Sequence, residues 1–138
     1  MSETPLIGAG ALDGRVAIVT GSTAGLGTRF AHVLADAGAT VIVTGRRTER
    51  IAEVVDAIGA RGGTAHGLRL DVTDPASIES CLEEVTEQHG VPQILVNNAG
   101  IPDAARAHKM SLELVDAVLD TNVRGPWLMA TGLARRLI

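Results

Sequence analysis

The sequence contains no tyrosine, a single cysteine and very few aromatic residues. Its aromatic content of 1% comes from Phe30 and Trp127 alone. One thiol cannot form an intrachain disulfide or a multi-sulfur zinc site, so Cys81 fits a reducing compartment. A chain of 138 residues with 46% hydrophobic content is long enough to bury a core without such cross-links.

An excess of positive charge and a long apolar run are also missing. The chain has 12 Lys and Arg against 16 Asp and Glu, a net charge of −4, so the electrostatic basis for nucleic-acid binding is absent. No stretch approaches the ~18 apolar residues of a membrane-spanning helix. Residues 1–10 contain Glu3 and Pro5, where a signal peptide needs a basic start and an apolar run. We expect a cytoplasmic protein with no nucleic-acid or membrane partner, and no metal, because the four His residues share no ligand spacing.

Short apolar runs alternate with helical periods along the chain. Four runs predict strands, at residues 16–20, 41–44, 65–70 and 94–96. Between them, apolar residues recur at helical spacing and predict three amphipathic helices, over residues 26–37, 51–58 and 78–85. A last helix is expected from about Ser111, with Pro126 interrupting its hydrogen bonding.

Residues that are typical of helix ends and starts lie at the boundaries of these predicted helices. Gly38, Gly59 and Gly90 stand where a helix ends in a left-handed residue, and Asp74 with Pro75 is typical of a helix start. Alternating strands and helices favour parallel strands joined by right-handed crossovers, with helices on both faces of one sheet. We therefore expect a single α/β domain over residues 11–138, preceded by an N-terminal tail.

The first turn from strand to helix, residues 20–27, reads Thr-Gly-Ser-Thr-Ala-Gly-Leu-Gly. Gly21, Gly25 and Gly27 let the backbone approach a ligand, while the amides and dipole of the following helix favour an anion. The spacing G-x-x-x-G-x-G differs from G-x-G-x-x-G, so the motif alone also fits a tight turn without a ligand. The strand before it and the helix after it favour a phosphate site.

The second strand ends at Gly45 and Arg46, where an NAD-binding sheet usually places an acid for the ribose hydroxyls. An acid there would repel a 2′-phosphate, whereas Arg46 can form a charge-assisted contact with one. This turn therefore predicts NADP in preference to NAD. Arg47 is more typical of a solvated residue ahead of a helix.

Two further strand ends carry polar or small residues. Asp71 and Val72 follow the third strand, and Asn97, Asn98, Ala99 and Gly100 follow the fourth. Ligands dock at the carboxyl ends of strands in open α/β sheets, so Asp71 is a candidate acceptor for an adenine amino group. The small Ala99 and Gly100 would let a ribose or nicotinamide lie against backbone. Asp and Asn also stabilise turns through their own backbone, and this alternative remains open for Asn97.

With these motifs in order, the sequence from about Leu12 onward resembles the short-chain dehydrogenase/reductase family. The resemblance rests on T-G-x-x-x-G-x-G at residues 20–27, D-V at 71–72, N-N-A-G at 97–100 and the Asn of Thr121-Asn122-Val123. It implies a Rossmann-type doubly wound parallel sheet, of which this chain would hold about four strands. The implied activity is an NADP-dependent oxidoreductase that transfers hydride between nicotinamide and a carbonyl or alcohol. Two alternatives remain: a non-catalytic dinucleotide-binding module, and a methyltransferase-like domain that is disfavoured without an acid at Gly45.

The resemblance also implies roles for particular residues. Asn97 would brace neighbouring strands, and Asn122 would interrupt its helix and hold a water in a proton relay to the active-site Lys. By the resemblance, the phosphates and ribose would be held by Ser22, Gly25, Leu26 and Gly27, beside Gly21. The 2′-phosphate would be bound by Arg46 and the adenine by Asp71 and Val72. The inner ribose would be bound by Asn98 and Ala99, beside Gly100.

The sequence departs from the family at the catalytic step. That step needs a Tyr acid, with a Lys a few residues later, but the sequence has no Tyr and its only Lys, Lys109, precedes Asn122. We therefore expect the N-terminal, cofactor-binding portion of a longer reductase, inactive as 138 residues and homo-oligomeric at full length. The resemblance does not separate ketoacyl-carrier-protein reductases from sugar or polyol dehydrogenases.

Overall fold

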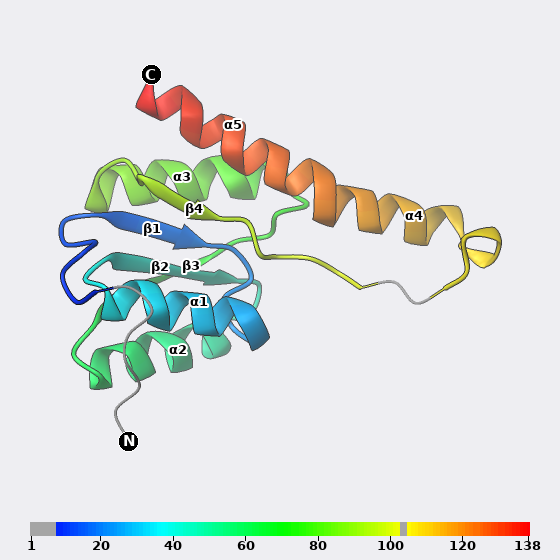
Figure 1. Ribbon diagram of the computed structural model, residues 1–138. Coiled ribbons are helices and arrows are strands. Elements are labelled where there is room, and N and C mark those ends of the chain that lie inside the picture. The colour runs from blue at the N-terminus through cyan, green and yellow to red at the C-terminus, as the bar shows by residue number, and fades with distance from the viewer. Residues whose placement is uncertain (1–7, 103–104) are drawn as a thin grey trace.

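The computed structural model describes residues 8–102 and 105–138. Within these ranges four parallel strands form one sheet in the order β3-β2-β1-β4 (Figure 1). The strands are β1 (Val16–Val19), β2 (Thr40–Gly45), β3 (Thr64–Arg69) and β4 (Ile94–Val96). In register, Ile18 of β1 lies between Ile42 of β2 and Leu95 of β4. The predicted parallel α/β sheet of about four strands is confirmed.

Helices cover both faces of this sheet. Helices α1 (Gly25–Asp36) and α2 (Thr48–Ala60) lie on one face, and α3 (Pro75–His89) and α5 (Gly125–Leu137) lie on the other (Figure 1). Successive strand residues point to opposite faces. Accordingly, Ala17 and Val19 belong to the α1–α2 core, whereas Val16 and Ile18 belong to the α3–α5 core. The central strand β1 is apolar at every position, so it buries side chains on both faces of the sheet.

The helix boundaries have local causes. The Asp74 carboxylate accepts a hydrogen bond from the amide of Ala76, with Pro75 in the first turn of α3. Gly38 (φ +104°) and Gly90 (φ +91°) follow α1 and α3 in left-handed conformations, as predicted. The prediction for Gly59 is wrong. Helix α2 continues to Ala60, and Gly62 (φ +87°) takes the left-handed position, because the closing bonds to the Ile58 carbonyl come from the amides of residues 61 and 63.

The last helical region is interrupted. After a short 3₁₀ turn η1 (Ala107–Lys109), α4 (Leu112–Leu119) begins at Ser111, whose hydroxyl accepts a bond from the Leu114 amide. A π-helical turn, η2 (Asp120–Arg124), then joins α4 to α5, and the Gly125 amide bonds the Asp120 carbonyl. Pro126 has no amide hydrogen, so the carbonyl of Asn122 has no donor four residues later. The predicted interruption at Pro126 is confirmed.

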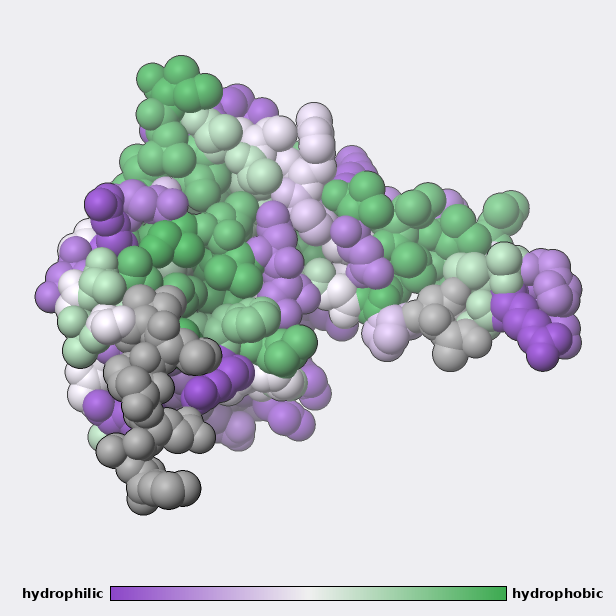
Figure 2. Space-filling model, viewed as in Figure 1, coloured by the Kyte–Doolittle hydropathy of each residue, from purple (hydrophilic) through white to green (hydrophobic). Residues whose placement is uncertain are grey.

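The arm formed by α4, η2 and the start of α5 projects beyond the sheet (Figure 1). No residue of α4 is buried, and apolar side chains are visible along this arm in Figure 2. Leu119 is 50% and Trp127 63% exposed. Further along α5, Met129 and Leu133 are buried in the core against α3. The arm therefore carries apolar surface that the sheet does not cover.

The chain turns toward the sheet well before β1. Residues 1–7 of the predicted tail lie outside the described residues. The Ala11 amide bonds the Gly8 carbonyl, and the Leu12 amide bonds the carbonyl of Ala37 at the end of α1. Leu12 packs against the α1–α2 core. This segment thus joins the domain at Leu12.

Among the helices of the described residues, none combines the length and apolar character needed to cross a membrane.

Candidate functional site

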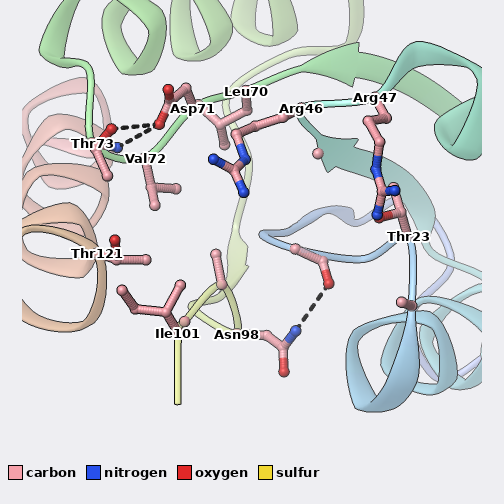
Figure 3. Close-up of a pocket in the computed structure, with 15 residues that line it drawn as sticks. Thr23, Arg46, Arg47, Leu70, Asp71, Val72, Thr73, Asn98, Ile101 and Thr121 are labelled. Atoms are coloured by element: carbon pink, nitrogen blue, oxygen red, sulfur yellow. Dashed lines mark hydrogen bonds between the residues drawn. The ribbon is translucent and has the colours of Figure 1, made fainter. Parts of the chain in front are cut away.

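A cavity of about 350 Å³ lies at the carboxyl ends of the four strands. Its volume is within the range of small-molecule sites. Figure 3 shows the side chains that surround it. Among the residues predicted to bind a cofactor, those that line the cavity are Gly21, Arg46, Asp71, Val72, Asn98, Ala99 and Gly100. The structure therefore brings together residues from four separate strand ends.

Two arginines lie at the end of β2. The Arg46 guanidinium is directed into the cavity, and Arg47 extends on the side where Thr23 lies (Figure 3). Both side chains are exposed. Arg47 is solvated and precedes a helix, as the sequence predicts, and it also lines the cavity. The cavity therefore has two cations at one end.

Asp71 is held in one orientation by Thr73. Its Oδ1 accepts bonds from the Thr73 hydroxyl (2.7 Å) and the Thr73 amide (2.9 Å). These bonds lower the pKa of the Asp71 carboxyl below its ordinary 3.8. Desolvation opposes them, and the charges of Arg46 and Arg69 lower the pKa by a lesser amount. Asp71 is therefore a charged acceptor at neutral pH.

Ser22 does not reach the cavity. Its hydroxyl donates to the Val19 carbonyl and accepts from the Thr44 amide, both at 2.9 Å, and its own amide donates to the Thr44 carbonyl. The residue is fully buried. The expectation that Ser22 holds a phosphate is thus corrected: its donors are already used to join the turn to β2.

The glycines of the turn have different structural roles. A Cβ on Gly27 would collide with the Gly21 carbonyl and the side-chain nitrogen of Asn98, so Gly27 lets α1 start close to the ends of β1 and β4. Gly25 has φ +58°, and a Cβ added there would meet nothing within 4 Å, which leaves open space at the helix start. Leu26 is 68% exposed. Gly25, Leu26 and Gly27 are not among the cavity-lining residues.

Asn98 joins the end of β4 to the turn after β1. Its side-chain nitrogen donates to the Gly21 carbonyl, and the amides of Asn98 and Ala99 both donate to the Thr20 hydroxyl, all at 3.0 Å. The Asn97 side chain instead donates to the Pro126 carbonyl, at 3.3 Å. The resemblance implies bracing between strands for Asn97, but Asn98 and Thr20 perform it, because the Asn97 side chain points toward α5.

Asn122 is paired with the backbone of Ile101. Its Oδ1 accepts from the Ile101 amide (2.8 Å), and its nitrogen donates to the Ile101 carbonyl (2.9 Å). These bonds fix the segment after Gly100 against η2. The Asn122 side chain is therefore hydrogen-bonded through both its oxygen and its nitrogen.

Sequence reasoning missed several residues that line the cavity. These residues belong to no motif of their own and lie next to positions that the motifs mark. They are Thr23, Ala24, Arg47, Leu70, Thr73, Ile101 and Thr121. Thr23 and Ala24 occupy the variable positions of the glycine-rich turn. Their location inside that turn was the one available signal for their role.

The sequence profile described as short chain dehydrogenase matches residues 15–138. The chain belongs to this family. It is 37% identical over 126 residues to the 3-oxoacyl-[acyl-carrier-protein] reductase FabG of Escherichia coli, covering 91% of this chain and 50% of that protein.

Solved structures are similar as well. The citronellol catabolism dehydrogenase AtuB of Pseudomonas aeruginosa superposes with a TM-score of 0.89 at 29% identity, covering 94% of this chain and 53% of that one. A short chain dehydrogenase from Burkholderia cenocepacia in complex with NADP superposes with a TM-score of 0.85 at 37% identity. The match covers 91% of this chain and 52% of that one. The chain spans about half the length of the curated relatives it matches.

Proposed function

We propose that this chain forms the NADP-binding part of an oxidoreductase that transfers hydride between nicotinamide and a carbonyl or alcohol. The observation that carries the proposal is the pair Arg46 and Arg47 on the cavity wall beside Gly45. Arginine forms charge-assisted, often bidentate contacts with phosphate. The strand end therefore offers cations where an NAD-binding sheet offers an acid.

The cavity suits the remaining parts of a dinucleotide. Asp71 and Val72 line the cavity and would contact the adenine, and Ala99 with Gly100, which also line it, would lie against the ribose and nicotinamide. A Cβ on Gly21 would lie 2.9 Å from the Cα of Ala99, so the turn lies directly against Ala99. The open space over Gly25 leaves the start of α1 accessible to a diphosphate. A bound NADPH would supply the hydride to a carbonyl, and a bound NADP⁺ would accept one from an alcohol.

The chain's own residues would position the site. Asn122 holds the Ile101 backbone beside Gly100, and its main-chain carbonyl would orient a water of the proton relay. Thr121 lines the cavity one residue earlier. The acid that protonates the carbonyl oxygen is not assigned to any of these 138 residues, which include no tyrosine.

Isothermal titration calorimetry with NADP⁺ and NAD⁺ tests the proposal. The unmutated chain should bind NADP⁺ more tightly, and Arg46→Ala should weaken NADP⁺ binding by roughly 5- to 150-fold, since a charge-assisted contact contributes about 1–3 kcal/mol. NAD⁺ binding should change little, because that cofactor has no 2′-phosphate.

Arg50→Ala is the matched control. Arg50 is an exposed residue of α2 outside the cavity lining, and its loss removes the same charge. It should leave the preference for NADP⁺ unchanged. Equal affinities of the unmutated chain for the two cofactors would overturn the proposal.

A further inference from the structure

Helix α5 starts directly on the backbone that follows β3. Its first residue, Gly125, is buried. A Cβ built on Gly125 would lie 2.8 Å from the carbonyl oxygen of Val72 and 3.0 Å from the Cβ of Val72. Both distances are shorter than an ordinary van der Waals contact of about 3.5 Å. Any side chain at position 125 would therefore push the start of α5 and Val72 apart.

The π-helical turn η2, which immediately precedes α5, contacts the segment that follows β4. There Asn122 bonds both backbone groups of Ile101, and its Oδ1 lies 3.1 Å from the position of a Cβ on Gly100. Gly100 and Ile101 line the cavity, and so does Val72 after β3. Thr121 of η2 lines it as well, on the same side as Val72 and Ile101 (Figure 3). The turn η2 therefore forms part of the cavity wall between the segments that follow β3 and β4.

The backbone around Val72 is fixed more firmly than η2. The Asp71 amide donates to the hydroxyl of Ser77 at 3.0 Å, and the Asp74 amide donates to the Asp71 carbonyl at 3.1 Å. Val72 itself is buried in the core beneath α3 and α5. In contrast, no residue of α4 or of η2 is buried. An added carbon at position 125 would therefore displace η2, because the backbone at Val72 has less freedom to move.

We propose that Gly125 is a positioning residue for the cofactor: because it has no side chain, α5 starts on Val72 and η2 is held against the cavity. Displacement of η2 would break the bonds between Asn122 and Ile101 and move Thr121 away from the cavity wall. Gly125 itself is not among the cavity-lining residues, so it acts through η2. This inference rests on the proposed function.

Gly125→Ala and Gly132→Ala, compared in the 138-residue chain, test the inference. Gly132 lies two turns further along α5, and a Cβ there would meet Cδ1 of Leu82 at 2.7 Å, the end of a side chain that can rotate. Both variants should lower the temperature of thermal unfolding. In calorimetry only Gly125→Ala should weaken NADP⁺ binding, by about tenfold, because a binding site tolerates displacements of only about 0.5 Å.

Amide hydrogen exchange followed by NMR gives a readout that a general loss of stability does not reproduce. The Ile101 amide is bonded to the side chain of Asn122. It should exchange faster in Gly125→Ala than in Gly132→Ala when each variant is compared at the same global stability, adjusted with urea, because only the first displaces η2.

Exchange of the Gly125 amide in the unmutated chain tests the inference even if Gly125→Ala does not fold. This amide bonds the Asp120 carbonyl within η2. Saturating NADP⁺ should slow its exchange, because coupling between η2 and the cofactor is reciprocal.

Three results would overturn the role of Gly125 and leave the proposed function standing. They are unchanged exchange of the Gly125 amide on NADP⁺ binding, equal NADP⁺ affinity of Gly125→Ala and the unmutated chain, and equal weakening of NADP⁺ binding by Gly125→Ala and Gly132→Ala. If the unmutated chain does not bind NADP⁺, the proposed function is wrong and this inference with it.

Discussion

The turn of residues 20–27 and the segment of residues 97–126 use polar side chains in opposite ways. In the turn, Thr20 and Ser22 are buried, and Ser22 bonds Thr44 of the adjacent strand. In the second segment, Asn97 and Asn122 are exposed and bond the backbone of Pro126 and Ile101. The first set stabilises the centre of the sheet, and the second fastens peripheral segments to it.

The difference follows from where the two regions lie. The turn connects β1 to α1 between the central strands β1 and β2, under the cover of α1 and α2. The second segment runs from β4, which has a neighbour on one side within the described residues, to the exposed arm. A buried hydroxyl must find protein partners, whereas an exposed amide competes with water. The buried hydroxyls of Thr20 and Ser22 are therefore structural, and Gly21 and Thr23 beside them line the cavity.

The largest effect should come from adding one carbon to the turn. Gly27→Ala would place a Cβ against the Gly21 carbonyl and the side-chain nitrogen of Asn98. We therefore expect the free energy of unfolding to fall by about 3 kcal/mol, the upper end of overpacking costs. Urea denaturation measures it. Gly59→Ala is the control, because Gly59 lies inside α2 with nothing within 4 Å, and it should raise stability by about 0.5–1 kcal/mol. Equal stability of Gly27→Ala and the unmutated chain would contradict the close packing.

A smaller loss of stability should distinguish the buried polar residues of the turn from the exposed ones of residues 97–126. Ser22→Ala leaves the buried amide of Thr44 without its partner and should cost about 1–3 kcal/mol, measured by the same denaturation. Asn97→Ala removes an exposed bond at 3.3 Å and should cost about 0.5 kcal/mol. If the two variants lose the same free energy of unfolding, the claim that buried and exposed polar residues contribute differently in these two regions is wrong.

The smallest effect concerns the charge of Asp71. Thr73→Val removes the hydroxyl that contributes most to lowering the pKa of Asp71, so that pKa should rise toward 3.8, as followed by NMR titration of the carboxyl. Because the folded-state pKa lies below the unfolded value, this contribution to stability is fully present above about pH 4 and is lost as the pH falls through the folded-state pKa. Thr73→Ser, which keeps the hydroxyl, should leave the pKa low. An unchanged pKa in Thr73→Val would assign the shift to the backbone bond and the nearby arginines.

The helix and strand pattern was largely predictable because it is encoded locally. Apolar spacing placed α1 and α3, and Asp74, Ser111, Gly38 and Gly90 marked boundaries that the structure has. Gly59 shows the limit of such signals. Several glycines follow one another after Ile58, and which of them adopts the left-handed conformation depends on the hydrogen bonds that close α2.

By itself, the sequence determined the order of the elements, the parallel sheet and the strand ends that line the cavity, because periodicity and motif order are properties of neighbouring residues. Only the tertiary structure decided which side chains face the cavity. Ser22 turns toward Thr44, 22 residues away, Asn122 pairs with Ile101, 21 residues away, and Thr23 fills the space beside Gly45. These contacts join separate elements, and their geometry is set by how closely the strands and helices pack.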